Sequence, residues 1–186
     1  MKPSSQATFT LSLLTAGILC ASTTAFAASV PAGTELAEKQ ELVRNNGNEP
    51  ASLDPHKVES DVEFNIISDL FEGLVSVSPS GEIQPRLAEK WENKDNTVWT
   101  FHLRPGITWS DGTAITAEDV VWSWQRLVDP KTVSPYASYP GNMHIVNAAD
   151  IAQGKKAPDT LGVKAINDTT LEVTLTQPNA AFLAML

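Results

Sequence analysis

The sequence has very little cysteine and an excess of acidic over basic side chains. Cys20 is the only cysteine in 186 residues, so an internal disulfide is excluded and the fold has to rely on a packed core. The formal net charge is −9, which disfavours a nucleic acid or an anionic membrane surface as a partner. After residue 27 there is no transmembrane run, no low-complexity segment and no internal repeat. We therefore predict a chain that has no nucleic-acid partner.

The sequence also lacks a catalytic or metal-binding pattern. The three histidines, His56, His102 and His144, have no spacing that suits a metal site or a general base. There is no Gly-rich phosphate loop, no HExxH motif and no nucleophile elbow. Asp111 and Gly112 fit a tight turn, in which Asp accepts backbone hydrogen bonds and Gly permits the backbone conformation. We predict that the protein is not an enzyme and needs no cofactor or metal.

The first 27 residues have the pattern of a secretory signal. Lys2 is the only charged residue before Glu35, and residues 9–20 form an apolar run of the length found in signal peptides. Ala25, Phe26 and Ala27 supply the small-x-small pattern, which predicts cleavage between Ala27 and Ala28. A lipoprotein signal requires a small residue before the cysteine, whereas Leu19 precedes Cys20. We therefore expect export with signal cleavage and without a lipid anchor.

Hydrophobic periodicity predicts a mixed α/β fold for the rest of the chain. Trp99, Phe101 and Leu103 alternate with polar residues, which is typical of a half-buried strand. Thr116 with Asp119 predicts the capped start of an amphipathic helix. The expected strands are 41–45, 74–78, a strand before the 92–96 turn, 97–104 and a hairpin of 162–166 with 170–176. The expected helices are 61–71, 116–129 and 147–154.

Two further features concern packing. All five tryptophans lie between residues 91 and 124, and we interpret them as core and corner packing rather than a ligand cage. Pro178 and Asn179 open a predicted helix, and the apolar residues 180–186 follow without a cap. We expect a truncated chain whose unfinished helix leaves apolar surface exposed and promotes aggregation.

Several blocks resemble, in order, the oligopeptide-binding proteins of bacterial ABC importers. The blocks are 42–47, 52–57, 69–74, 99–104, 109–113, 124–126, 134–139 and 161–166. The resemblance implies an α/β, two-lobed periplasmic binding protein (class II type, peptide-binding cluster), here truncated. Such a protein closes on an extended peptide, held as if it were an added strand, and delivers it to a membrane permease. It also implies a periplasmic location, and we expect a monomer.

The resemblance further implies a division into domains. Residues 1–27 would be the signal peptide, and residues 28–71 the first segment of lobe I. Residues 72–186 would form the smaller extra domain of the family (domain II), incomplete at its C-terminal end. The remainder of lobe I and domain III would be absent from this chain.

Two positions, Tyr136 and Glu59, match ligand-contacting positions of that family, and Asp61 is a third candidate ligand-binding residue. Tyr136 would donate its hydroxyl to the main chain of the ligand, and Glu59 would line a side-chain pocket. Asp61 belongs to the same ligand-binding loop, but Ser60 and Asp61 replace the Gly-Val of close oligopeptide binders, so pocket preference stays open. The group that captures the ligand's amino terminus has no counterpart in this chain. Without the resemblance, Tyr136 would be read as a packed surface residue and Glu59 as a solvated carboxylate.

Alternatives within the same fold are binders of murein tripeptide, dipeptide, a nickel chelate or a sugar. An alternative of another class is a secreted hydrolase or a chaperone-like domain. Without the residues of the missing part, the sequence does not decide between these ligands.

Overall fold

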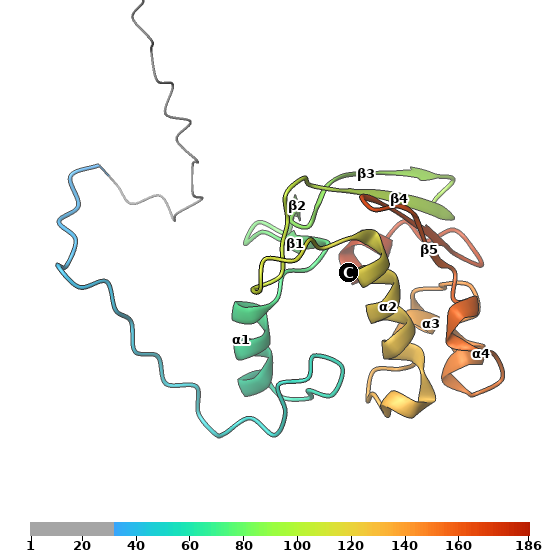
Figure 1. Cartoon of the computed structure of the whole chain (residues 1–186), viewed down its shortest axis with the longest axis horizontal. Helices are drawn as coiled ribbons and strands as arrows, with labels where there is room; N and C mark the ends of the chain where they lie inside the picture. The colour runs from blue at the N-terminus through green and yellow to red at the C-terminus, as the bar shows by residue number, and fades with distance from the viewer. Residues whose placement is uncertain (1–31) are drawn as a thin grey trace, which may run out of the picture. The chain divides into compact units, whose positions relative to one another are not determined.

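The computed structural model describes residues 32–186 (Figure 1). Its compact part runs from Arg44 to Leu186. Residues 32–43 belong to a separate unit and carry no helix or strand. The predicted signal peptide, its cleavage site after Ala27 and Cys20 all lie outside the described residues.

A four-stranded antiparallel sheet forms the centre of the compact part. Its order is β3-β4-β6-β5. The strands are β3 (Ala88–Lys94), β4 (Val98–Leu103), β5 (Val163–Asn167) and β6 (Thr170–Thr174). A separate two-stranded hairpin joins β1 (Val75–Val77) to β2 (Ile83–Pro85). These strands confirm the predictions for 74–78, 97–104 and the closing hairpin, and they add β2, which the periodicity does not reveal.

One face of the sheet carries the core. Trp99 and Phe101 of β4 stand directly opposite Val173 and Leu171 of β6, and all four side chains are buried. Cross-strand pairs of this kind are the unit by which a sheet is stabilised. His102 lies on the other face of β4, half-exposed, as the alternation predicts.

Helices cover that face as a second layer. Figure 1 shows α2 (Ala117–Val128), α3 (Tyr139–Asn142) and α4 (Ala148–Ala152) on one side of the sheet. The predicted capping box at the start of α2 is present: the Asp119 carboxylate accepts from the Thr116 backbone N–H at 2.7 Å. The described residues also contain three short 3₁₀ helices: η1 (Pro130–Thr132), η2 (Pro158–Thr160) and η3 (Phe182–Met185). The helices expected at 116–129 and 147–154 are therefore confirmed.

The C-terminal segment differs from the prediction. Residues 182–185 form a 3₁₀ helix, and Phe182 is fully buried, with its ring centroid 5.4 Å from Trp99 and 6.4 Å from Phe101. The prediction that this segment leaves its apolar surface exposed is wrong for Phe182. The reason is tertiary: the core face of β4 offers an aromatic partner that local periodicity does not reveal.

The strand predicted at 41–45 is also wrong. These residues pair with no strand in the described part of the chain, and Leu42 and Val43 are 89% and 97% exposed. A strand requires a neighbour to satisfy its backbone groups, and residue composition alone does not show whether one is present.

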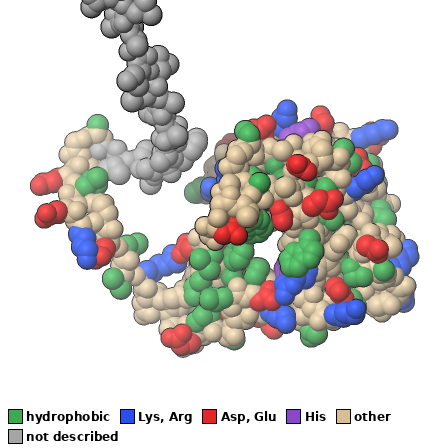
Figure 2. Space-filling view, viewed as in Figure 1, with side chains coloured by type: hydrophobic (Ala, Val, Ile, Leu, Met, Phe, Trp, Pro, Cys, Tyr) green, Lys and Arg blue, Asp and Glu red, His purple; other side chains and the backbone are tan. Residues whose placement is uncertain are grey.

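Helix α1 (Asp61–Leu70) forms where the spacing predicts it, but its burial is unusual. Glu63 is its only buried residue, while Phe64 and Leu70 are exposed. Figure 2 shows hydrophobic side chains gathered over this helix. The apolar stripe of α1 is therefore not part of the core described here.

The tryptophans divide between core and surface. Trp99 is buried, Trp91 and Trp124 are half-buried, and Trp109 is exposed at the 108–114 corner. Trp122 is 64% exposed, so the interpretation of all five as packing residues is wrong for Trp122.

Candidate functional site

The loop before α1 is organised around one buried carboxylate. Glu63 accepts backbone N–H groups of Ala51 and Ser52 on one oxygen, at 2.8 and 3.0 Å. Its other oxygen accepts those of Glu59 and Ser60, also at 2.8 and 3.0 Å, and the Ser60 hydroxyl. These hydrogen bonds favour the charged form and lower the pKa of Glu63 from 4.5 to about 2. The 51–60 loop is thus closed onto the N-terminus of α1.

The same loop is also tied to α2. The Arg126 guanidinium donates to both oxygens of Asp54, from Nη1 at 2.8 Å and from Nη2 at 2.6 Å. Both side chains are about 30% exposed, so the pair is partly shielded from water. The hydrogen bond from Arg126 holds the pKa of Asp54 well below its usual range. Such a bidentate pair fixes the direction as well as the distance between loop and helix.

His56 and Trp122 complete this cluster. Nδ1 of His56 lies 2.7 Å from Arg126 Nη1, and Nε2 lies 3.3 Å from the Ser123 hydroxyl. The Trp122 ring lies under the Arg126 guanidinium, 5.9 Å from ring centroid to Cζ, a cation–π distance. Burial and the Arg126 charge lower the pKa of His56. Charged, aromatic and titratable groups from loop and helix therefore meet at one place.

Tyr136 lies in the 133–138 loop, which follows η1. Its ring meets the ring of Phe64 of α1, with centroids 6.4 Å apart and planes inclined at 65°. Tyr136 is 39% exposed, and its hydroxyl has no hydrogen-bond partner among the residues that the structure describes. Val133, which opens the loop, has φ +54°, a costly conformation for a β-branched residue. Tyr136 is thus held by its ring and has a free polar end.

Glu59 and Asp61 lie at the N-terminal end of α1. Glu59 is exposed, and its backbone N–H is held by Glu63. Asp61 is the first residue of α1, and its carboxylate accepts the Val62 backbone N–H at 2.9 Å. No hydrogen bond or ring contact within residues 32–186 joins Tyr136 to Glu59 or Asp61. The structure places all three on or against the N-terminal part of α1 without bringing their side chains into contact.

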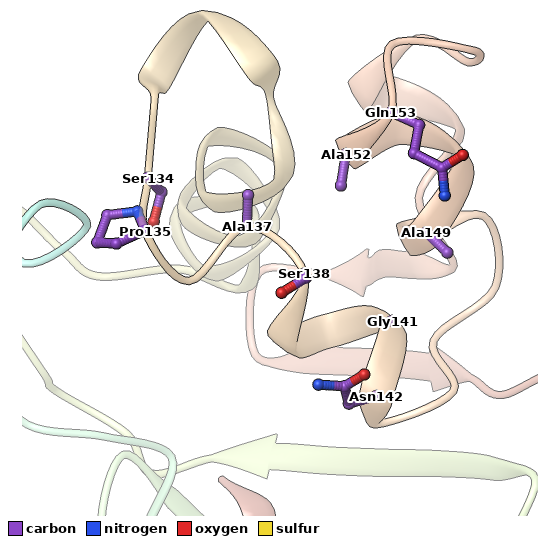
Figure 3. Close-up of a pocket in the computed structure, with 9 residues that line it drawn as sticks. All are labelled: Ser134, Pro135, Ala137, Ser138, Gly141, Asn142, Ala149, Ala152 and Gln153. Carbon is purple, nitrogen blue, oxygen red and sulfur yellow. The ribbon is translucent and has the colours of Figure 1, made fainter.

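A shallow pocket of about 540 Å³ lies beside the Tyr136 loop. Figure 3 shows the two sides of this pocket: one is formed by Ser134, Pro135, Ala137, Ser138, Gly141 and Asn142, and the other by Ala149, Ala152 and Gln153. Its side chains are small or neutral, and Tyr136 does not line it. A pocket that binds a ligand specifically usually has aromatic walls and convergent polar groups, which this one lacks.

Residues 32–186 contain neither a cluster of metal-binding side chains nor a helix that could span a membrane. No group of acidic, histidine or cysteine side chains within them is arranged to hold a metal ion. None of the helices in this part of the chain has the length and apolar character needed to cross a bilayer.

The comparisons with known proteins agree with this description. Residues 82–186 match the family model "Bacterial extracellular solute-binding proteins, family 5 Middle". The chain belongs to this family. A curated relative, the periplasmic oligopeptide-binding protein OppA of Salmonella typhimurium, is 57% identical over 178 residues, which cover 94% of this chain and 33% of the relative. The chain thus spans about a third of the length of the curated relatives it matches.

Solved structures of the family share the fold. The murein tripeptide-binding protein MppA of Escherichia coli has a TM-score of 0.78 at 52% identity, over 81% of this chain and 30% of that one. Haemophilus influenzae OppA, in complex with the peptide RPPGFSPFR, has a TM-score of 0.77 at 49% identity, over 81% and 29%. The predicted mixed α/β fold of periplasmic peptide-binding proteins is therefore confirmed. These relatives are solute-binding proteins, not enzymes.

Sequence reasoning missed the Asp54–Arg126 pair, because 72 residues separate the partners. Glu63 could have been found, because Ser60 followed three residues later by Glu63 is a capping-box pattern. The exposure of Trp122 could also have been predicted, because helical periodicity places the buried stripe of α2 at Val120, Val121 and Trp124 and puts Trp122 on the opposite face.

Proposed function

We propose that this chain forms part of an extracytoplasmic binding protein that captures oligopeptides and delivers them to the permease of an ABC importer. The observation that carries the proposal is the 57% identity to an oligopeptide-binding protein across 94% of this chain. The binding activity would need the length that the relatives have, since this chain spans about a third of them.

The surface around α1 is the part of the binding site that this chain would supply. The Tyr136 hydroxyl is suited to donate to a peptide carbonyl, because its ring is held by Phe64 and its polar end is free. Glu59 is suited to line a side-chain pocket, because Glu63 fixes its backbone while its own carboxylate is exposed. Asp61 would add a second carboxylate at the same edge. A basic or polar peptide side chain would suit this pair.

The division into a lobe I segment (28–71) and a smaller domain (72–186), each continued elsewhere in a full-length protein, is part of the same proposal. It is supported by the exposed apolar side chains of α1, Phe64 and Leu70, which fit a further layer of protein. A monomer is also proposed.

Peptide uptake tests the proposed function. A hybrid protein would carry residues 28–186 in place of the matching part of Salmonella typhimurium OppA, behind that protein's own signal. In cells that lack their own oligopeptide-binding protein and need an amino acid, the hybrid should restore growth on peptides that contain it. A hybrid that is exported and stable but gives no growth on any peptide would contradict the proposal. Growth on murein tripeptide alone would favour the murein-peptide alternative.

Export is tested separately. We propose a periplasmic location, reached by cleavage between Ala27 and Ala28, and the periplasmic relatives support it. N-terminal sequencing of the chain recovered from the periplasm should give Ala28 as the first residue. A protein that still begins at Met1, or one lipidated at Cys20, would contradict this assignment.

A further inference from the structure

His56 lies where the loop before α1 meets helix α2. Asp54, two residues earlier, binds Arg126 of α2 through two hydrogen bonds. Glu59, three residues later, is the proposed ligand contact. His56 thus lies in the chain between the contact of Asp54 with α2 and the position of Glu59.

The neighbours of the His56 ring determine which nitrogen carries its proton. A guanidinium can only donate hydrogen bonds, so the contact of 2.7 Å from Arg126 Nη1 requires an unprotonated Nδ1. The proton then lies on Nε2, which donates to the Ser123 hydroxyl at 3.3 Å. A second proton on the ring would sit on Nδ1, so the Nδ1–H group of a positively charged His56 would face the N–H group of the positively charged Arg126. The contact with Arg126 exists only while His56 is neutral.

We propose that His56 is a positioning residue for peptide binding: in its neutral Nε2–H form it locks residues 56–58 of the loop onto α2, and protonation of the ring opens this lock while Asp54 stays paired with Arg126. The role in peptide binding rests on the proposed function, whereas the lock itself does not. The opened loop stays attached to α1, because its hydrogen bonds to Glu63 do not involve His56.

The charges around the ring support this account. Within the described residues, Arg126 and Asp54 are the charged groups that act on His56, and Ser123 is its polar neighbour on α2. Burial and Arg126 lower the pKa of His56, whereas Asp54 acts in the opposite direction. Asp54 stays ionised in mild acid because its own pKa is lowered. Mild acid therefore changes His56 without discharging the Asp54–Arg126 pair.

The first experiment reads the ring directly, in the purified full chain. Nitrogen NMR of the histidine rings at about pH 7 should show His56 with Nδ1 unprotonated and Nε2 protonated, and its pKa should lie below the ordinary histidine value of about 6.5. An Nδ1–H tautomer, or a His56 ring whose pKa is not below the ordinary histidine value of about 6.5, would overturn the proposal.

The second experiment reads the loop. Hydrogen exchange of the Lys57 amide, which donates to the Asp54 carbonyl at 2.9 Å, is followed at about pH 7 and about pH 5, after correction for the intrinsic effect of pH. The wild type should lose protection on the order of tenfold in acid, as when one charge-assisted hydrogen bond is lost. His56→Asn keeps an acceptor for Arg126 and should show no acid step. Arg126→Gln should lose protection at both pH values, and the control His102→Asn should behave as the wild type.

Unchanged protection in Arg126→Gln together with no acid step in the wild type would overturn the proposal, because Glu63 alone would then hold the loop. Neither experiment contains a peptide, so a failure of the proposed function leaves both readouts intact. In the hybrid protein, acid should weaken peptide affinity more in the wild type than in His56→Asn. Equal weakening in both, with the two loop results as expected, would remove the role in binding and leave the lock.

Discussion

The ring of Phe64 meets the ring of Tyr136 edge-on, with 6.4 Å between the ring centroids. The contact joins α1 to the loop that follows η1. An edge-on aromatic pair contributes roughly 0.5–1.5 kcal/mol beyond the area it buries, so it holds the tyrosine ring in place. The hydroxyl group takes no part in this contact, which leaves it available to a ligand.

Replacing Tyr136 by Phe in the hybrid protein should weaken peptide binding without disturbing the fold. The ring contact with Phe64 is kept, and one neutral hydrogen bond to the ligand is lost, which costs roughly 0.5–1.5 kcal/mol. Calorimetry should therefore show affinity reduced roughly two- to tenfold. The matched control is Tyr139→Phe, which removes a hydroxyl that donates to the Met185 carbonyl at 3.0 Å. That variant should lose some stability and keep its affinity; equal affinity in wild type and Tyr136→Phe would leave Tyr136 as a packing residue only.

Glu63→Gln should lower the thermal unfolding midpoint of the chain. The carboxylate accepts four backbone N–H groups and the Ser60 hydroxyl, whereas an amide turns one of its two acceptors into a donor. Two backbone donors would then face another donor. Glu59→Gln is the control, since the Glu59 side chain is exposed, and it should leave the midpoint unchanged. A midpoint in Glu63→Gln that equals that of Glu59→Gln would show that the carboxylate does not organise the loop.

Stability should fall in acid through the carboxylates of the same region. The pKa of Glu63 is lowered from 4.5 to about 2, and that of Asp54 is lowered in the same direction. The unfolded chain binds these protons first, so their stabilisation is fully present above the ordinary pKa and is lost as the pH falls through the folded one. Urea unfolding should show the free energy of unfolding decreasing between about pH 4.5 and about pH 2. A decrease of the same size in Glu63→Gln would rule out Glu63 as its source.

The elements that local pattern determines could be predicted from the sequence. Trp99, Phe101 and Leu103 alternate on β4, and Thr116 with Asp119 caps α2, because both patterns depend on neighbours a few residues apart. Long-range partners could not be predicted. The pairing of Asp54 with Arg126 and the docking of Phe182 on Trp99 depend on how distant segments meet. The strand expected at 41–45 was wrong for the same reason, because nothing local shows whether a neighbouring strand exists.

The site residues also divide into those that the sequence indicates and those that only long-range contacts reveal. The resemblance marked Tyr136 and Glu59 as ligand contacts, whereas their contacts with Phe64 and Glu63 are seen only in the structure, although the capping-box pattern at Ser60 already marks Glu63. The role of the three ligand residues stays a prediction. The residues that position them are the ones that tertiary packing determines.

Phe182→Ala should destabilise the chain strongly. The side chain is fully buried between Trp99 and Phe101, and truncating a buried phenylalanine costs about 3–5 kcal/mol. Leu186→Ala, at a partly exposed position of the same segment, should change stability by less than about 0.5 kcal/mol. Denaturant unfolding measures both. Similar values for the two variants would mean that the last residues do not belong to the core.

Peptide titration of the hybrid protein, compared with residues 28–186 alone, tests the central claim most directly. We predict micromolar or tighter binding of tri- to pentapeptides by the hybrid. The part taken from the relative and residues 28–186 should each show no measurable binding by themselves, because a peptide held between two walls requires both. A folded, monodisperse hybrid that binds no peptide would contradict the account. So would micromolar binding by residues 28–186 alone.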